Sequence, residues 1–188
     1  MRIISGKLKG RVLKIPKGIK IRPSSQKVKQ ALFNILGDQV SGSSFLELFA
    51  GTGSVGIEAF SRGANRVVLV ENNRLCLQAI AENLKSLQVP QAAFKLLGVS
   101  VQRAMKLSEQ RNEKFDLVFL DPPYHQDQLK NSLIDLSLCD ILASQSWVIA
   151  EHKKDEILPH LINRLKVMFT KTYGDTALSF YQNRREKQ

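Results

Sequence analysis

The chain has little that would place it in a membrane or in an oxidising compartment. Its apolar runs stay well short of the roughly 18 residues of a membrane-spanning helix, and its first residues lack the apolar stretch of a signal peptide. The two cysteines, Cys76 and Cys139, form no CxxC pair, so we expect a cytoplasmic protein without disulfides. The histidines have no partners at metal-ligand spacing, which predicts that no metal is bound. They are His125, His152 and His160.

Acidic residues are missing from the N-terminal segment, which holds ten lysines and arginines in its first 30 residues before the first acid at Asp38. The whole chain carries a net charge of +11, and the remaining residues are almost balanced. Such one-sided charge is typical of a segment that binds a polyanion, although a merely solvated terminus is the alternative. A membrane-surface role is weaker because the segment has no bulky apolar face. The residues expected to contact phosphates are Arg2, Lys7, Lys9, Arg11, Arg22, Lys27 and Lys29.

The length of 188 residues, with 43% apolar residues, fits one globular domain with a small appendage. We expect the appendage to be residues 1–40 and the main domain to be residues 41–188. The appendage is predicted to contain a β-hairpin and a helix. Its expected elements are strands Arg2–Ser5 and Leu8–Ile15, then a helix capped by Ser24 or Ser25 that ends before Gly37.

Strand-like and helix-like segments alternate through the main domain, which predicts βαβ crossovers and an α/β fold. We expect a Rossmann-like, mostly parallel seven-stranded sheet that ends in an antiparallel hairpin. The expected strands are Phe45–Phe49, Arg66–Val70, Phe94–Leu97, Phe115–Leu120, Trp147–Glu151, Leu165–Thr172 and Ala177–Gln182. The expected helices are Ser54–Ser61, Arg74–Leu87, Val101–Gln110 and Gln128–Leu142.

A glycine-rich loop, Gly51-x-Gly53-x-x-Gly56, follows the first of these strands, and Glu71 ends the next strand. The spacing fits a dinucleotide fingerprint, and a purely structural turn is also possible. Glu47 precedes the loop and would repel a pyrophosphate, but it suits the ammonium and sulfonium of S-adenosylmethionine (AdoMet). Glu71 can accept the ribose hydroxyls. The residues expected to bind AdoMet are Glu47, Phe49, Ala50, Gly51, Thr52, Gly53, Glu71 and Asn72.

Asp121-Pro122-Pro123-Tyr124 directly follows the strand Phe115–Leu120. Ligand crevices of open parallel sheets lie at the carboxyl ends of strands next to the switch point, so we expect Asp121 beside the glycine loop. The Asp121 carboxylate and the Pro122 carbonyl can accept both hydrogens of an exocyclic amine, which directs its lone pair towards a methyl donor. Pro122 and Pro123 stiffen the loop, and Tyr124 can stack on a base that is flipped or single-stranded. In isolation, the segment also fits a rigid turn.

Together, these features resemble the bacterial small-subunit ribosomal RNA methyltransferase D family. The resemblance covers essentially the whole length, and the Arg22-Pro23-Ser24 segment with the helix around Ala31–Leu36 is its most specific part. It continues through Phe45–Ala64, Val70-Glu71 and Asp116–Tyr124. The chain departs from the family pattern in Glu47, where Asp is usual, and in Gln26, Lys29 and Gln30. No carboxylate stands near Leu97–Ser100, where many methyltransferases bind the adenine amine.

The resemblance implies methyl transfer from AdoMet to the N2 amine of a guanine in 16S rRNA, by a monomer that acts on a substrate assembled with ribosomal proteins. Asp121, Pro122, Pro123 and Tyr124 would be catalytic, with no separate general base. A DNA adenine-N6 methyltransferase is an alternative, but the 64 residues after Tyr124 leave no room for a target-recognition domain. A non-catalytic RNA-binding protein is another, against which the intact Asp121 and glycine loop argue.

Overall fold

The computed structural model describes residues 1–16, 25–123 and 127–184. Its strands are β1 (Ser44–Leu48), β2 (Arg66–Glu71), β3 (Phe94–Gly98), β4 (Phe115–Leu120), β5 (Leu142–Lys153), β6 (Leu161–Ile162), β7 (Leu165–Tyr173) and β8 (Thr176–Asn183). Its α-helices are α1 (Gln26–Leu36), α2 (Ser54–Ser61), α3 (Arg74–Ser86), α4 (Val101–Gln110) and α5 (Gln128–Leu138). Short 3₁₀ turns occupy Gly37–Val40 and Gln91–Ala93.

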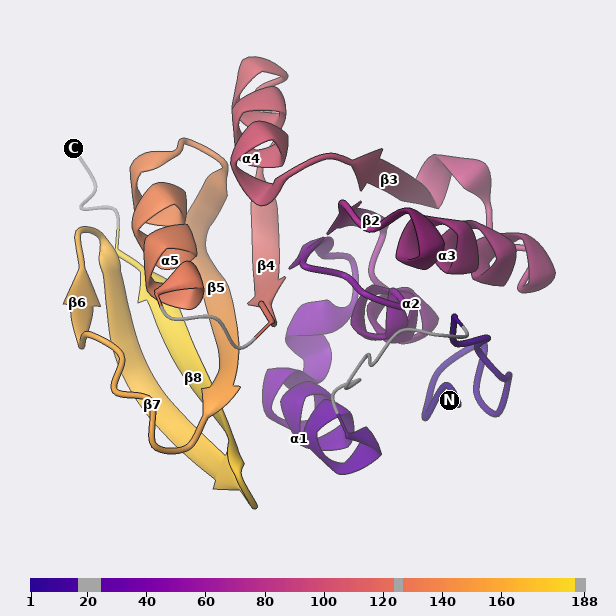
Figure 1. Cartoon of the computed structure of the whole chain (residues 1–188), viewed down its shortest axis with the longest axis horizontal. Coiled ribbons are helices and arrows are strands. Elements are labelled where there is room, and N and C mark those ends of the chain that lie inside the picture. The colour runs from indigo at the N-terminus through magenta and orange to yellow at the C-terminus, as the bar shows by residue number, and fades with distance from the viewer. Residues whose placement is uncertain (17–24, 124–126, 185–188) are drawn as a thin grey trace.

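The strands form one sheet in the order β3-β2-β1-β4-β5-β8-β7-β6 (Figure 1). The first five in this order are parallel, and β8, β7 and β6 are antiparallel to their neighbours. The predicted α/β fold, with its parallel sheet and closing antiparallel hairpin, is therefore confirmed. The sheet has eight strands rather than seven because the two-residue strand β6 pairs with the start of β7.

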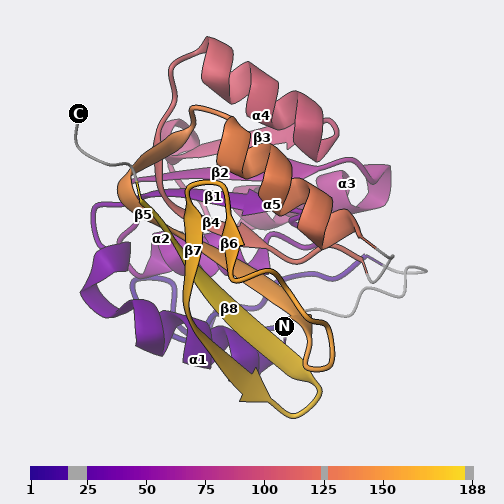
Figure 2. The same cartoon turned by 90° about the vertical axis from the view of Figure 1, so that its left-hand side faces the viewer.

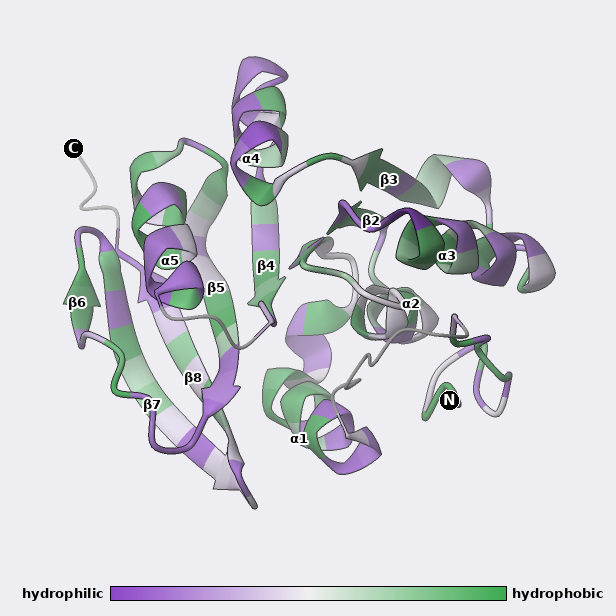
Figure 3. Ribbon diagram, in the orientation of Figure 1, coloured by the Kyte–Doolittle hydropathy of each residue, from purple (hydrophilic) through white to green (hydrophobic). Residues whose placement is uncertain are grey.

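Helices cover both faces of the sheet, and each face has its own apolar core. Alternate residues of each strand point to opposite faces, so Val118 lies in the core under α4 and α5, whereas Leu117 and Phe119 lie in the core under α1 and α2. Figure 2 shows α4 and α5 side by side on one face and α1 on the other. Hydropathy colouring shows apolar strands between helices with polar outer faces (Figure 3). Burial on both faces explains why these strands appear in the sequence as continuous apolar runs.

The predicted N-terminal strands are wrong, because residues 1–16 contain a single antiparallel bridge, Arg2–Val12, and no strand. Four backbone N–H groups of this segment bond to α2 instead, and that of Lys7 donates to the Ser61 carbonyl at 2.8 Å. Those of Ile4 and Ser5 donate to the Glu58 carboxylate, and that of Leu8 donates to Ser61 Oγ. Backbone pairing between the two segments is limited to the region of the bridge, where the Ile3 N–H donates to the Arg11 carbonyl at 3.0 Å and the Leu13 N–H to the Met1 carbonyl at 2.8 Å. The residues between these pairs bond to the neighbouring helix instead.

The boundary between α5 and β5 also differs from the prediction. The helix ends at Leu138 rather than Leu142, and the next residue, Cys139, is extended with ψ 142°. Leu142 instead starts β5 and pairs with Phe115 of β4. The predicted cap of α1 is confirmed at Ser25, whose side chain accepts from the Val28 N–H at 3.1 Å. Among the described residues, no helix has the length and apolar character to cross a membrane.

Candidate active site at the carboxyl ends of the parallel strands

The sheet register brings the two sequence motifs together. Leu48, the last residue of β1, pairs with Val70 of β2 on one side and with Leu120 of β4 on the other. The residues that follow these three are Phe49, Glu71 and Asp121, so they stand side by side at the carboxyl ends of neighbouring strands. β4 lies next to β1, so Asp121 leaves the sheet beside the glycine loop, as the sequence predicts.

The glycine loop makes a tight turn between β1 and α2. Gly53 caps α2 in the left-handed region, with φ 70°, and its N–H donates to the Ala50 carbonyl at 2.7 Å. Gly56 lies against the sheet, where an added Cβ would be 2.5 Å from Leu69 Cδ2 and 2.8 Å from Glu47 Oε2. Gly53 therefore supplies the backbone conformation of the turn, while Gly56 allows α2 to pack closely on the sheet.

Glu47 lies beneath α2 rather than in the open part of the site. It is 3% exposed, and its Oε2 accepts from the Gly56 N–H at 2.8 Å. Burial raises the pKa of its carboxyl to about 8, against the opposing effect of backbone N–H donors. This placement differs from the predicted direct contact with the cofactor's positive charges. Glu47 instead holds the first turn of α2 against β1.

Glu71 is fixed by backbone donors at the end of β2. Its Oε2 accepts from the Gly51 N–H at 2.7 Å, and its Oε1 accepts from the N–H groups of Asn72 and Asn73 at 2.8 Å. A carboxylate oxygen can accept more than one hydrogen bond, so Glu71 retains capacity for hydroxyl donors. The loop and the Glu71 carboxylate thus form one rigid unit.

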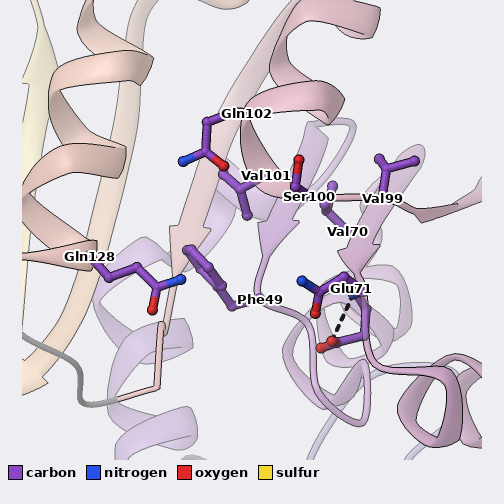
Figure 4. Close-up of a pocket in the computed structure, with 9 residues that line it drawn as sticks. Phe49, Val70, Glu71, Val99, Ser100, Val101, Gln102 and Gln128 are labelled. Carbon is purple, nitrogen blue, oxygen red and sulfur yellow. Dashed lines mark hydrogen bonds between the residues drawn. The ribbon is translucent and has the colours of Figure 1, made fainter.

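A cleft of about 310 Å³, including its open mouth, lies beside this unit (Figure 4). Four apolar and five polar side chains line its walls, and two of the polar ones are glutamines. Gln102 of α4 donates from Nε2 to Asp135 Oδ2 of α5 at 3.4 Å, which leaves its amide oxygen for a ligand. The lining residues are Phe49, Val70, Glu71, Asn72, Val99, Ser100, Val101, Gln102 and Gln128. The mixed lining suits a flat ring with polar groups at its edge.

Three of the predicted cofactor residues, Phe49, Glu71 and Asn72, line the cleft, and the loop from Ala50 to Gly53 connects β1 to α2 next to it. Sequence reasoning missed the five lining residues from α4 and α5 and their approaches, which are Val99, Ser100, Val101, Gln102 and Gln128. One signal was available for the first four. Ser100 caps the helix after the third strand, and that helix start faces the ligand crevice of a parallel sheet.

Asp121 is half-buried and Pro122 is buried, whereas Pro123 is exposed. Tyr124, which was expected to stack on a base, lies outside the described residues, as does Arg22 of the basic segment. Asp121 and Pro122, the two expected acceptors, both lie within the described residues. They stand one strand away from Phe49.

The N-terminal basic segment presents most of its predicted phosphate contacts to solvent. Arg2, Lys7, Lys9, Arg11 and Lys27 are all exposed. Lys7 Nζ lies 3.5 Å from the centroid of the Phe60 ring, and Arg11 Nη2 donates to the Ser86 carbonyl at 2.9 Å. These contacts attach the segment to α2 and α3, so its charges are displayed on a fixed surface.

Lys29 is the exception, because it is buried and does not contact phosphates as predicted. Its side chain is fully buried, with Nζ 3.4 Å from Glu58 Oε2 and bonded to the Arg2 carbonyl at 3.3 Å. Desolvation lowers the pKa of this ammonium, although Glu58 opposes the shift. A buried, paired lysine cannot reach a phosphate, so Lys29 serves the packing of α1 on α2.

Comparison with known proteins gives a consistent result. Residues 1–182 match the family model described as Conserved hypothetical protein 95. The chain is 36% identical to a Bacillus subtilis protein named "Putative rRNA methyltransferase YlbH", over 98% of the chain and 100% of that protein. It is 31% identical to "Ribosomal RNA small subunit methyltransferase D" of Escherichia coli strain K12, over 100% of the chain and 91% of that protein.

The fold also agrees with that of a solved structure. "Putative methyltransferase yhhF from Escherichia coli" superposes with a TM-score of 0.84 at 30% identity, and the match covers 97% of both chains. Sequence similarity and fold similarity thus extend over nearly the whole chain, including the glycine loop and the Asp121 loop. The chain belongs to the family of ribosomal RNA small subunit methyltransferase D.

Proposed function

We propose that this protein transfers a methyl group from AdoMet to the exocyclic N2 amine of a guanine in the 16S rRNA of the small ribosomal subunit. Relatives over the full length carry the name of small-subunit rRNA methyltransferases, which supports rRNA methylation. The choice of an amine rests on Asp121 and Pro122. The observation that carries the proposal is the register at Leu48, which sets the cofactor loop beside the amine-binding loop.

The residues around the cleft fit AdoMet. Phe49, Val70, Val99 and Val101 offer apolar surfaces for the adenine ring, and Glu71 can accept the ribose hydroxyls. The Gln102 amide oxygen can accept from the adenine amine, which is the role that other methyltransferases give to a carboxylate. When bound, AdoMet supplies an electrophilic methyl group.

Asp121 and Pro122 prepare the acceptor nitrogen. The lone pair of an amine on an aromatic ring is delocalised, so the free amine is a poor nucleophile. Two acceptors on rigid backbone can bind both of its hydrogens and hold its lone pair towards the cleft. After transfer, the extra proton on nitrogen passes to water or to Asp121. This loop binds only a base outside a helical stack, which means a flipped or single-stranded guanine.

The basic N-terminal segment binds the RNA substrate in this proposal. Arg2, Lys7, Lys9, Arg11 and Lys27 are exposed and can neutralise phosphates. We propose that the protein acts as a monomer in the cytoplasm, on rRNA already assembled with ribosomal proteins. In this proposal, residues 1–40 bind RNA and residues 41–188 carry the reaction, although the two parts pack together.

Mass mapping of modified nucleosides tests the function directly. Small-subunit rRNA from cells that lack the protein should contain one N2-methylguanosine fewer than wild-type rRNA. Purified protein with AdoMet should restore that nucleoside on small subunits from the deficient cells. Restoration of a different methylated nucleoside would refute N2 specificity, and unchanged rRNA in the deficient cells would refute rRNA as the substrate.

A further inference from the structure

Glu151 is a buried carboxylate to which the reaction above gives no role. It lies in β5 and is 6% exposed. The parallel register pairs Leu120 of β4 with Ala150 of β5. Asp121 directly follows β4, Glu151 is the next residue of β5, and neighbouring strands lie about 4.8 Å apart. The backbone at Glu151 is therefore one strand spacing from the backbone of the amine-binding loop.

The alternation along β5 fixes the face on which the Glu151 side chain lies. His152 points to one face, where its Nε2 bonds to Ser179 Oγ at 2.8 Å. Ile149 belongs to the opposite core, under α1 and α2. Glu151 shares the face of Ile149, and its partner across β8 is Leu178 of the same core. Figure 1 shows β4 and β5 ending in the same direction, towards α1. The carboxylate thus stands at the carboxyl edge of the sheet, on the α1 side of β5.

A guanine in this site has one more donor than the amine-binding loop accounts for. Its Watson–Crick edge presents the N2 amine and, next to it, the N1–H. Asp121 and Pro122 accept the two amine hydrogens. Once the base has left its stack, a buried N1–H without an acceptor is strongly disfavoured. On the β5 side of Asp121, the buried acceptor on the face of Ile149 is Glu151.

We propose that Glu151 is a specificity-determining residue that accepts the N1–H of the target guanine. The inference rests on the proposed guanine-N2 activity and names the group that selects the base. Adenine and 2-aminopurine carry a lone pair at N1 instead of a hydrogen. A carboxylate opposite that lone pair places two acceptors together, so the site rejects these bases.

The test replaces the acceptor at residue 151 with a group that can donate, and replaces the N1–H donor of the base with an unprotonated N1. The Glu151→Gln variant has an amide that can donate to an unprotonated N1. Guanosine and 2-aminopurine riboside, which both carry a 2-amino group, are used as competitors of small-subunit methylation by wild type and variant. The wild-type enzyme should prefer guanosine at least tenfold. The variant should reduce that preference at least tenfold, because guanosine loses affinity and 2-aminopurine riboside gains it.

The His152→Gln variant is the matched control, since it alters a buried polar residue on the same strand but on the opposite face. It should leave the preference for guanosine unchanged, with thermal unfolding used to compare the stability of all three proteins. Equal weakening of both nucleosides by Glu151→Gln would make Glu151 purely structural. A wild-type enzyme that takes both nucleosides equally would overturn the proposal even if the variant failed to fold. Mapping of modified nucleosides in rRNA tests the proposed function separately. If rRNA contains the expected N2-methylguanosine but Glu151→Gln keeps the wild-type preference for guanosine, only the role of Glu151 is overturned.

Discussion

Lys29 and Glu58 form an ion pair that is closed to solvent, with Nζ 3.4 Å from Oε2. The Glu58 carboxylate also accepts from Arg62 Nε at 2.9 Å and from two backbone N–H groups of the N-terminal segment. One buried carboxylate therefore joins α1, α2 and residues 1–5. This connection explains why the basic segment is held on the main domain rather than attached as a separate tail.

Removing one partner of this pair should destabilise the whole protein. Lys29→Met leaves the buried Glu58 with less compensating charge, which costs about 3–5 kcal/mol of unfolding free energy for pairs of this kind. Lys27→Met, an exposed position on the same helix, should change the unfolding free energy by about 0.5 kcal/mol or less. Urea unfolding measures both variants. Similar values for the two would show that the buried pair contributes nothing.

The buried carboxyl of Glu47 should make stability depend on pH. Its pKa is raised to about 8 in the folded protein from 4.5 in the unfolded chain, because burial disfavours the charged form. The folded state therefore holds a proton that the unfolded state releases, and stability falls as the pH rises from about 4.5 to 8. Glu47→Gln, which keeps an acceptor for the Gly56 N–H, should flatten this slope.

Urea unfolding at several pH values between 5 and 9 measures that slope. Glu82→Gln is a suitable control, since Glu82 is exposed and its pKa is lowered by hydrogen bonds to Gln78 and Lys14. Its titration lies below the window, so the variant should retain the wild-type slope. If Glu47→Gln retains the slope as well, Glu47 is ionised in the folded protein at neutral pH.

The alternating pattern of the main domain could be predicted because parallel strands covered on both faces need continuous apolar runs. The bounds of α2, α4 and β4 agree with the prediction to the residue. The burial of Lys29 could not be predicted, because its partner Glu58 lies on another helix and only the packing of α1 on α2 buries both side chains. The N-terminal strands are reduced to one bridge for a related reason, since Glu58 and Ser61 accept hydrogen bonds from the backbone N–H groups that lie between the paired ends of the segment.

The two loops of the candidate site could be recognised because each is a contiguous motif, and the strand order then placed them together. Gln128 of the cleft could not be recognised, since it comes from a separate segment and carries no local signature. Glu47 shows the limit of an argument from position alone. The end of β1 is close to the loop. However, because Gly56 has no side chain, the Glu47 carboxylate fits beneath α2 and accepts from the Gly56 N–H.

Asp121 should be required for turnover and not for cofactor binding. Loss of a positioned hydrogen-bonding group at a reacting centre costs roughly a hundredfold or more in rate, so Asp121→Ala should lower methylation of small subunits by at least that factor. Calorimetry should show little change in AdoMet affinity. Asp116→Asn alters an exposed carboxylate at the other end of β4 and should stay active. Near wild-type turnover by Asp121→Ala would exclude Asp121 from orienting the amine.

Gln102 should contribute to cofactor affinity. Gln102→Leu removes the acceptor proposed for the adenine amine, and a lost hydrogen bond of about 1 kcal/mol weakens binding roughly fivefold. Gln110→Leu, at the exposed end of the same helix, should bind AdoMet as the wild type does. Calorimetry with AdoMet and with NAD measures both, and no binding of NAD is expected. An unchanged AdoMet affinity in Gln102→Leu would place the adenine amine elsewhere.

The exposed basic residues near the N-terminus should set the salt dependence of RNA binding. If about five of them meet phosphates, log affinity should fall against log salt with a slope of magnitude near 3.5–4.5. Deleting residues 1–20 is a poor test because Glu58 would lose its backbone partners. Replacing Lys7, Lys9 and Arg11 with Gln keeps those contacts and should reduce the slope by about 2–3.

The control replaces three exposed basic residues on and after α4 and α5, namely Lys106, Arg111 and Lys130, also with Gln. Both triple variants lose the same charge, so any general effect of net charge on binding is common to them. Only the N-terminal variant should show the smaller slope and the loss of methylation on small subunits, while both retain AdoMet binding. An equal reduction of slope in the two variants would mean that RNA responds to overall charge. The N-terminal segment would then not be the surface that binds rRNA.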